Sequence, residues 1–374
     1  MKKLLSILTV ALLLAGVMAP AVFASGEENY SLVVTDIVPA DSGNDISQEL
    51  QTLIDNNPNR TIYFPDGEYL LSRPIRTPAD PNKSVSLKLA DFAVIKAAGD
   101  FPAGEAVIQL GGKDPYNTTR VNGSNYALEG GIIDGSNIAN GVSINSGRET
   151  AIRNCSIKNT VIGIHIMYGA NSGSSDSDIF GVNIIGTGKT DSVGILIEGF
   201  DNTLTNIRIG NTFTGVQIKS QGNILRNIHP LYTSDYTDYE NSCGFLIEGG
   251  NNWLDYCYSD QYATGFRTTD NGCSKLHDCF CYWYSPREGT HTAIKADKKF
   301  NSKVTNFTAG FHSDAEKRVL LSVGEIGGTG SITNLDTSEE DLSDTVYKAY
   351  QADIGFAERL FASFVLWFNS IFAI

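Results

Sequence analysis

Residues 204–228 read LTNIRIGNTFTGVQIKSQGNILRNI. The segment Leu204-Thr205-Asn206-Ile207 that opens this stretch returns at its end as Leu225-Arg226-Asn227-Ile228. Between the two copies lies Gly215-Val216-Gln217-Ile218, in which apolar and polar side chains alternate. Such alternation is typical of a β-strand with one buried face. The stretch therefore predicts short strands that recur with a short period.

The same period runs through most of the chain, because apolar strand starts recur every 21 to 29 residues. They are Ile132, Cys155, Val182, Ile207, Ile228, Cys257, Cys279, Phe307 and Leu335. A turn residue, in most cases Asn or Asp, precedes these starts and tolerates the left-handed backbone of a tight corner. A further strand of each repeat is introduced in most cases by Gly, as at Gly163, Gly194, Gly215, Gly244 and Gly265. Three short strands per repeat predict a parallel β-helix with coils about 4.8 Å apart.

The N-terminal part differs from these repeats. Asp45 precedes apolar residues at helical spacing, which predicts an amphipathic helix up to Asn56 with Asp45 as its N-cap. Residues 61–71 then form two β-rich runs divided by the turn signal Pro65-Asp66-Gly67. We expect the helix to cap the first coil of the solenoid.

A family resemblance rests on these N-terminal elements and on the coils that follow. The segments that carry it are residues 45–56, Ile62-Tyr63-Phe64-Pro65-Asp66-Gly67-Glu68-Tyr69 and Gly130-Gly131-Ile132-Ile133-Asp134-Gly135. They resemble the pectate-lyase-like superfamily, and the opening resembles its rhamnogalacturonase and epimerase-like branch. The resemblance covers roughly residues 30–336. It implies an all-β, single-stranded right-handed parallel β-helix that is secreted and that acts on a polysaccharide or binds one.

Composition narrows the possible partners. The chain has 374 residues and a formal net charge of −14, with 42 Asp plus Glu against 28 Lys plus Arg. This charge disfavours nucleic-acid binding, because phosphate contacts need Lys and Arg. It also disfavours a strongly anionic polysaccharide, unless a local cation compensates. A hydrophobic content of 41% is too high for a disordered chain.

Both ends of the chain differ in composition from the repeats. Residues 1–24 match a secretory signal, with Lys2 and Lys3, an apolar run and the site Val22-Phe23-Ala24. We therefore expect an exported bacterial protein, with the β-helix domain over residues 25–344. Residues 345–374 predict an apolar helix that caps the solenoid, mediates self-association or lies on a membrane surface.

The period also predicts which side chains share one outer face. If the strand starts point into the core, the residue after each start faces solvent on one sheet. That row reads Ser156, Asn183, Arg208, His229, Tyr258, Phe280 and Thr308, and the row two residues later reads Lys158, Ile185, Gly210, Leu231, Asp260 and Tyr282. A register error of one residue would bury all of them.

Aromatic rings gather around the middle of this face. The predicted substrate-binding residues are Tyr232, Phe280, Tyr282, Trp283 and Tyr284. Rings beside hydrogen-bonding groups suit a sugar, whose C–H faces stack while its hydroxyls pair. Residues 232–240, which are rich in Tyr and carboxylates, form an insertion that we expect to overhang the same side. Exposed rings also occur simply as stabilising ladders, so a non-catalytic glycan-binding or surface-adhesion module is the alternative.

Two chemistries fit the predicted face. Hydrolysis needs two carboxylates, for which we favour Asp260 paired with Asp235, Asp238 or Glu240. A lyase needs a cation for the uronate carboxylate and a base for the adjacent proton, and Arg208, His229 and Tyr258 are the right residue types. The loop acids could also hold Ca²⁺, although their spacing is not that of a calcium loop. We otherwise expect no cofactor and no other metal.

The six cysteines indicate neither a metal site nor a disulfide framework. Cys257 and Cys279 start equivalent strands in successive coils, which predicts a stack of buried thiols. Their side chains would run parallel, and that geometry suits a disulfide poorly. We also expect Cys281, two residues after Cys279, to lie in the core.

Overall fold

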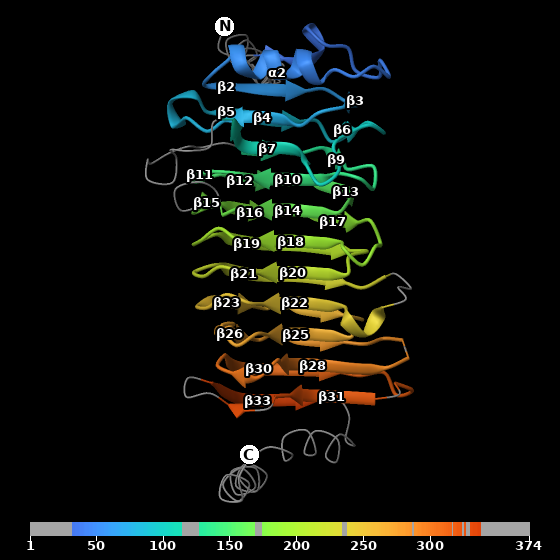
Figure 1. The fold of residues 1–374 in the computed structure, drawn as a ribbon, viewed down its shortest axis with the longest axis vertical. Helices are drawn as coiled ribbons and strands as arrows, with labels where there is room; N and C mark the ends of the chain where they lie inside the picture. Colours follow the sequence, from blue (N-terminus) through green and yellow to red (C-terminus); the bar gives the residue numbers. More distant parts are fainter. Residues whose placement is uncertain are drawn as a thin grey trace, which may run out of the picture. The chain divides into compact units, whose positions relative to one another are not determined.

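The computed structural model describes residues 32–113, 127–168, 174–233, 238–285, 288–315, 317–323, 325–326 and 330–337. The predicted signal segment (residues 1–24) and C-terminal helix (residues 345–374) lie outside the described residues and stay predictions. From β1 (Leu32–Val33) onward, parallel strands stack coil upon coil (Figure 1). The predicted parallel β-helix is confirmed. No helix in this part of the chain is long and apolar enough to span a membrane.

Each coil contains three strand positions, which we call first, second and third in chain order. The first strands are β2 (Arg60–Phe64), β5 (Val85–Leu89), β8 (Ala127–Glu129), β12 (Ala151–Arg153), β16 (Asp178–Phe180), β23 (Asn252–Asp255) and β26 (Ser274–His277). The second strands are β3 (Gly67–Leu71), β6 (Ala93–Ala97), β9 (Ile132–Asp134), β13 (Ser156–Thr160), β17 (Asn183–Gly186), β24 (Tyr258–Asp260) and β27 (Phe280–Tyr282). Four longer strands span both positions: β19 (Thr203–Gly210), β21 (Ile224–Leu231), β30 (Lys303–Gly310) and β33 (Ser331–Thr337).

The third strands form a separate ten-stranded sheet within the described residues. They are β4 (Ile75–Pro78), β7 (Ala106–Lys113), β10 (Asn140–Ile144), β14 (Ile162–Ile166), β18 (Val193–Ile197), β20 (Thr214–Ile218), β22 (Cys243–Ile247), β25 (Thr264–Thr268), β28 (Thr290–Ala296) and β31 (Lys317–Ser322). Two small pairs lie beside the coils, β11 (Gly147–Arg148) with β15 (Ser174–Ser175) and β29 (Lys299–Phe300) with β32 (Glu325–Ile326). Short 3-10 turns are η1 (Val34–Asp36), η2 (Pro81–Lys83) and η3 (Tyr239–Asn241).

A left-handed residue separates the first and second strand of most coils. Asn206 and Asn227 have φ of 57° and 52°, and Asn154, Asp278, Asn306 and Asn334 have similar values. Asn is among the non-glycine residues that best tolerate this conformation, as the sequence predicted. Asn227 Nδ2 also donates to Asn206 Oδ1 at 2.8 Å, so the corner residues of successive coils are tied together. Tyr256 is the exception in this row, with φ of 52° on a bulky side chain.

The glycines of the third strands have a packing role. A Cβ on Gly163 would lie 2.5 Å from Ile184 Cγ2, and one on Gly194 would lie 2.4 Å from Ile209 Cγ2. Side chains of the second strands therefore fill the space that a side chain on these glycines would need. This close approach explains why Gly introduces the third strand in coil after coil.

The interior is one continuous apolar core. The predicted inward residues from Cys155 to Phe307 are all buried in it. Phe245 and Phe266 stack inside it with ring centroids 4.6 Å apart, because third-strand residues of successive coils lie in register. Cys257, Cys279 and Cys281 are buried free thiols, as predicted. Burial raises the pKa of Cys279 and Cys281 well above the ordinary thiol value, so both stay protonated.

The N-terminal helix is α2 (Ser47–Asn56), and its Leu50 and Ile54 are fully buried in the same core. Asp45 accepts hydrogen bonds from the Ser47 and Ser72 backbone N–H groups, at 3.0 and 2.9 Å, and from both hydroxyls. Partial burial raises the pKa of Asp45, but these hydrogen bonds outweigh that effect and lower the pKa to about 2. The N-cap residue of the helix is Ile46 and not the predicted Asp45, which instead joins the helix entry to the end of β3.

One predicted strand start is shifted by a residue. Ile132 pairs with Ser156, not with Cys155, and so lies on the outward row. Gly130 and Gly131 both have positive φ and occupy the corner at this coil, which displaces the strand by one position. From Cys155 to Leu335 the predicted register is confirmed.

Candidate functional site

The predicted outward row exists, and its middle brings His229 to Asp260. Arg208 lies in register with His229, and Leu231 in register with Asp260 of the next coil. His229 Nε2 is 2.8 Å from Asp260 Oδ2. Their side chains are only 14% and 12% exposed, so the bond is shielded from water. Since a carboxylate oxygen accepts, Nε2 carries the proton, and a neutral His229 has its lone pair on Nδ1.

Asp260 depends on this bond. Its second oxygen, Oδ1, is buried and has no hydrogen-bond partner among the described residues. A buried polar atom without a partner costs about 1–3 kcal/mol. The hydrogen bond with His229 therefore compensates for the burial of the Asp260 carboxylate, and the two side chains form a unit.

Tyr258 lies directly against His229. Their ring centroids are 3.6 Å apart with 25° between the planes. Burial raises the pKa of the Tyr258 hydroxyl, the Asp260 charge adds to this effect, and the Arg208 charge opposes it. The phenol therefore stays protonated at neutral pH and can donate a proton.

Arg208 places a positive charge on this face next to His229. Its side chain is exposed, one coil before His229, and in register with Asn183 on its other side. A guanidinium at this place can pair with a carboxylate in two parallel hydrogen bonds. Arg208, His229, Tyr258 and Asp260 thus occupy one outward patch of three successive coils.

Three of the five predicted substrate-binding aromatics are exposed. Phe280 and Tyr282 are the outward residues of β27, and Tyr284 follows in the same connection. Tyr282 and Tyr284 are 47% and 49% exposed, with ring centroids 6.3 Å apart. Tyr282 is in register with Asp260 of the preceding coil.

The prediction that Tyr232 and Trp283 contact substrate is wrong, because both are buried. Tyr232 packs edge-on against Tyr239 and Tyr262 at centroid distances of 5.2 and 5.4 Å. Trp283 stacks between His291 and Phe311, and its Nε1 donates to the Tyr262 carbonyl at 2.8 Å. The chain leaves the sheet after Leu231 and Tyr282, so strand alternation no longer fixes the direction of the next side chain.

The predicted overhanging insertion is described in part. Asp235 lies outside the described residues, so its place beside Asp260 stays a prediction. Tyr239, in η3, donates its hydroxyl to the Gln261 carbonyl of the next coil at 3.0 Å. Glu240 is exposed and comes close to Gly289, where a Cβ would lie 3.1 Å from its Oε1. The aromatic cluster of Tyr232, Tyr239 and Tyr262 therefore anchors this loop across the neighbouring coils.

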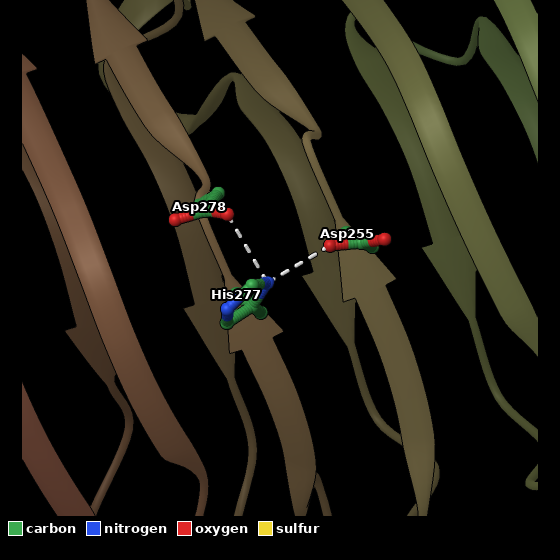
Figure 2. A group of neighbouring side chains, drawn as sticks. All are labelled: Asp255, His277 and Asp278. Atoms are coloured by element: carbon green, nitrogen blue, oxygen red, sulfur yellow. Dashed lines mark hydrogen bonds and ion pairs between the residues drawn. The ribbon is translucent and has the colours of Figure 1, made fainter.

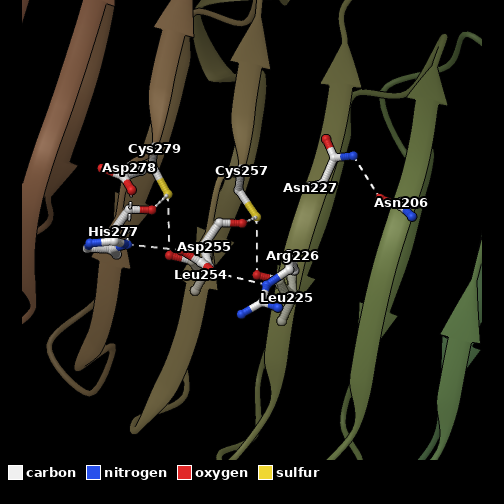
Figure 3. Close-up of polar contacts among 10 residues, drawn as sticks. All are labelled: Asn206, Leu225, Arg226, Asn227, Leu254, Asp255, Cys257, His277, Asp278 and Cys279. Atoms are coloured by element: carbon white, nitrogen blue, oxygen red, sulfur yellow. Dashed lines mark hydrogen bonds and ion pairs between the residues drawn. The ribbon is translucent and has the colours of Figure 1, made fainter.

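A second polar cluster, not predicted from the sequence, lies at the corner of the first strands (Figure 2). His277 Nδ1 is 3.0 Å from Asp255 Oδ1 and 3.3 Å from Asp278 Oδ2. Nitrogen and carboxylate atoms at such spacing suit a divalent cation. Asp255 is also paired with Arg226 at 3.0 Å, and the hydrogen bond to Asp255 raises the pKa of His277 (Figure 3). The Asp255 carboxylate thus already has Arg226 and His277 as partners. The sequence signal for this cluster is that Arg226, Asp255 and His277 occupy equal positions in successive coils.

Comparison with known proteins shows similarity of fold. No protein-family model and no curated protein sequence matches this chain. A solved alginate lyase from Paenibacillus sp. FPU-7 has a TM-score of 0.54 at 14% identity, covering 77% of this chain and 96% of that one. An endo-xylogalacturonan hydrolase from Aspergillus tubingensis has a TM-score of 0.55 at 15% identity, covering 79% and 90%.

Viral proteins are also similar. A tailspike variant of E. coli bacteriophage HK620 has a TM-score of 0.62 at 12% identity over 82% of this chain, and Geobacillus virus E2 ORF18 has 0.54 at 16% over 82%. This chain spans only 62% and 59% of those two proteins. The fold that this chain shares with these proteins is a right-handed parallel β-helix. That part of the family resemblance is confirmed.

Proposed function

We propose that this protein cleaves a uronate-containing polysaccharide by β-elimination. The observation that carries the proposal is the shielded bond from His229 Nε2 to Asp260 Oδ2 beside Tyr258 and Arg208. It leaves Nδ1 of a neutral imidazole as a base, next to a cation and a protonated phenol. The alginate lyase and the xylogalacturonan hydrolase support a glycan as the ligand class for this fold, at low identity.

The reaction uses these groups in one step. Arg208 pairs with the uronate carboxylate and stabilises the negative charge that develops when the neighbouring carbon loses its proton. His229 Nδ1 takes that proton, the electron pair forms a carbon–carbon double bond, and the bond to the glycosidic oxygen breaks. Tyr258 gives its hydroxyl proton to the leaving oxygen. Solvent then removes the proton from His229 and restores the one on Tyr258.

Asp260 has a supporting role in this scheme. It fixes the imidazole tautomer, and its negative charge stabilises the imidazolium that forms when the proton is taken. Hydrolysis would instead need a second carboxylate opposite Asp260. Of the predicted partners, Glu240 turns toward Gly289 and Asp238 accepts a hydrogen bond from Asn241 Nδ2 at 2.7 Å, whereas Asp235 lies outside the described residues. The arrangement of the described side chains therefore favours elimination.

The site of action follows from the sequence expectations. We propose that the protein is exported by its N-terminal signal, is cleaved after Ala24, and meets its polymer outside the cell. The predicted C-terminal helix then caps the solenoid, joins a second copy or rests on a membrane surface. We propose no resident cofactor, and Ca²⁺ enters as a variable of the assay.

A glycan panel tests the proposed reaction. The mature protein is incubated with uronate-containing and neutral polysaccharides, with added Ca²⁺ or with a chelator. Ultraviolet absorbance follows unsaturated sugars, and a reducing-end assay follows total cleavage. We expect both signals, and only with polymers that contain uronate. Reducing ends without unsaturated product would indicate a hydrolase, and binding without either signal would indicate a non-catalytic glycan-binding module.

A further inference from the structure

His229, Tyr258 and Phe280 form a continuous stack of rings along three coils. The centroids of Tyr258 and Phe280 are 4.4 Å apart with 5° between the planes, and those of His229 and Tyr258 are 3.6 Å apart. Tyr258 and Phe280 are in register on β24 and β27. The stack therefore follows the coil spacing, with ring faces turned toward neighbouring coils.

This geometry determines what a sugar could touch. One face of Tyr258 is covered by His229 and the other by Phe280, so neither is open for a pyranose ring. Phe280 has one face on Tyr258, and its other neighbour in register is Thr308. Tyr282 and Tyr284 are more exposed, and they lie beyond the stack. Phe280 is 36% exposed, less than either of these tyrosines, and one of its faces belongs to the stack.

The stack limits the motion of the proposed base. Asp260 holds the Nε2 edge of the imidazole, and Tyr258 lies flat against one of its faces. Rotation of the imidazole would break the stack, the hydrogen bond, or both. Tyr258 in turn is held in its plane by Phe280. Catalytic groups need such support, because small errors in placement reduce rates strongly.

We propose that Phe280 is a positioning residue, which braces Tyr258 and through it fixes the orientation of His229. The expected effect of Phe280 on kcat rests on the proposed function, whereas its expected effect on the orientation of His229 does not. The sequence alone favoured a sugar contact for Phe280. The parallel planes of Phe280 and Tyr258 favour the bracing role.

The test compares Phe280→Leu, which removes the ring, with Phe280→Tyr, which keeps it. Circular dichroism first verifies that both variants are folded. The rate at which diethyl pyrocarbonate modifies His229 is then followed by peptide mass spectrometry, with His277, exposed on the adjacent face of the first strands, as the reference. Steady-state kinetics on the polymer identified by the glycan panel give kcat and KM separately.

We expect Phe280→Leu to accelerate modification of His229 several-fold without changing His277, and Phe280→Tyr to behave as the wild type. In turnover, Phe280→Leu should lower kcat by about tenfold while KM stays within about twofold. An unchanged rate at His229, or a higher KM with unchanged kcat, would overturn the bracing role. If no polymer is cleaved, the proposed reaction fails, and the modification rates alone decide whether Phe280 holds His229.

Discussion

His229 Nε2 and Asp260 Oδ2 lie 2.8 Å apart, although 31 residues separate the two in the sequence. One coil, from Ile228 to Cys257, accounts for 29 of these residues. The other two lead from one outward side chain to the next along the strand. Asp260 is therefore the diagonal neighbour of His229 on the outer face, with Tyr258 directly opposite. A pair built this way depends on the register of the coils, because a shift of one residue would turn both side chains inward.

Replacing Asp260 by Asn should reduce elimination while the fold persists. The amide cannot stabilise an imidazolium, and it can favour the tautomer with the proton on Nδ1. We expect kcat to fall by about 10²- to 10⁴-fold, since general base catalysis is worth about that much. Ultraviolet absorbance of unsaturated product measures it, and the melting temperature serves as the control for folding. Full turnover by Asp260→Asn would remove this carboxylate from the mechanism.

Arg208 should control activity on anionic polymers. Arg208→Gln removes the cation, and we expect kcat/KM to fall by about 10²-fold or more, as for other removed charge-stabilising groups. Arg208→Lys should recover part of the loss, because an ammonium keeps the charge without the paired hydrogen bonds. Arg226→Gln is the matched control, with the same change in net charge on the adjacent face. Equal losses in both variants would show that only overall charge matters.

Tyr282 should contribute to binding more than to the chemical step. It is exposed next to Asp260, and an aromatic contact is worth about 0.5–1.5 kcal/mol. Tyr282→Ala should therefore raise KM by about two- to tenfold with little change in kcat, whereas Tyr282→Phe should retain the wild-type KM. Oligosaccharide titration by calorimetry provides an independent measurement. A loss of kcat alone in Tyr282→Ala would argue against a stacking contact.

The sequence predicted the fold and the outward row for a single physical reason. Repeating apolar and Asn residues fix both the coil length and the corner, and strand alternation then determines which side chains face out. The repeat therefore predicts that Arg208, His229, Tyr258 and Asp260 share one face. The predicted start at Ile132 is wrong by one residue, because Gly130 and Gly131 both have positive φ and form a two-residue corner there.

Side chains outside the strands could not be predicted in this way. Tyr232 and Trp283 each follow a strand directly, but the chain turns there and both rings enter a buried aromatic cluster. The strand pattern does not predict the His277 cluster, because Asp255 lies on the preceding coil and Asp278 is a corner residue. The bond between His229 and Asp260 was also not predicted, since a sequence gives the face but not the rotamers that join diagonal neighbours.

The corner residue Asn227 should stabilise the fold through its backbone and its side chain. Its φ is 52°, and its Nδ2 donates to Asn206 Oδ1. Asn227→Ala should lower the free energy of unfolding by about 2 kcal/mol, from left-handed strain and the lost hydrogen bond. Asn227→Gly keeps the backbone conformation and should lose about 1 kcal/mol. Urea unfolding followed by circular dichroism measures both, and an Ala variant at least as stable as the Gly variant would contradict the role of positive φ.

Asp45 should make the N-terminal end of the β-helix sensitive to acid. Its hydrogen bonds from Ser47 and Ser72 lower its pKa from 3.8 to about 2. A carboxyl with a lowered folded-state pKa stabilises the fold above the unfolded value of 3.8, and the contribution disappears as the pH falls from there through about 2. The melting temperature of the wild type should therefore drop more steeply between pH 4 and pH 2 than that of Asp45→Asn, which has no carboxyl to titrate. Parallel curves for the two proteins over this range would show that Asp45 does not couple protonation to folding.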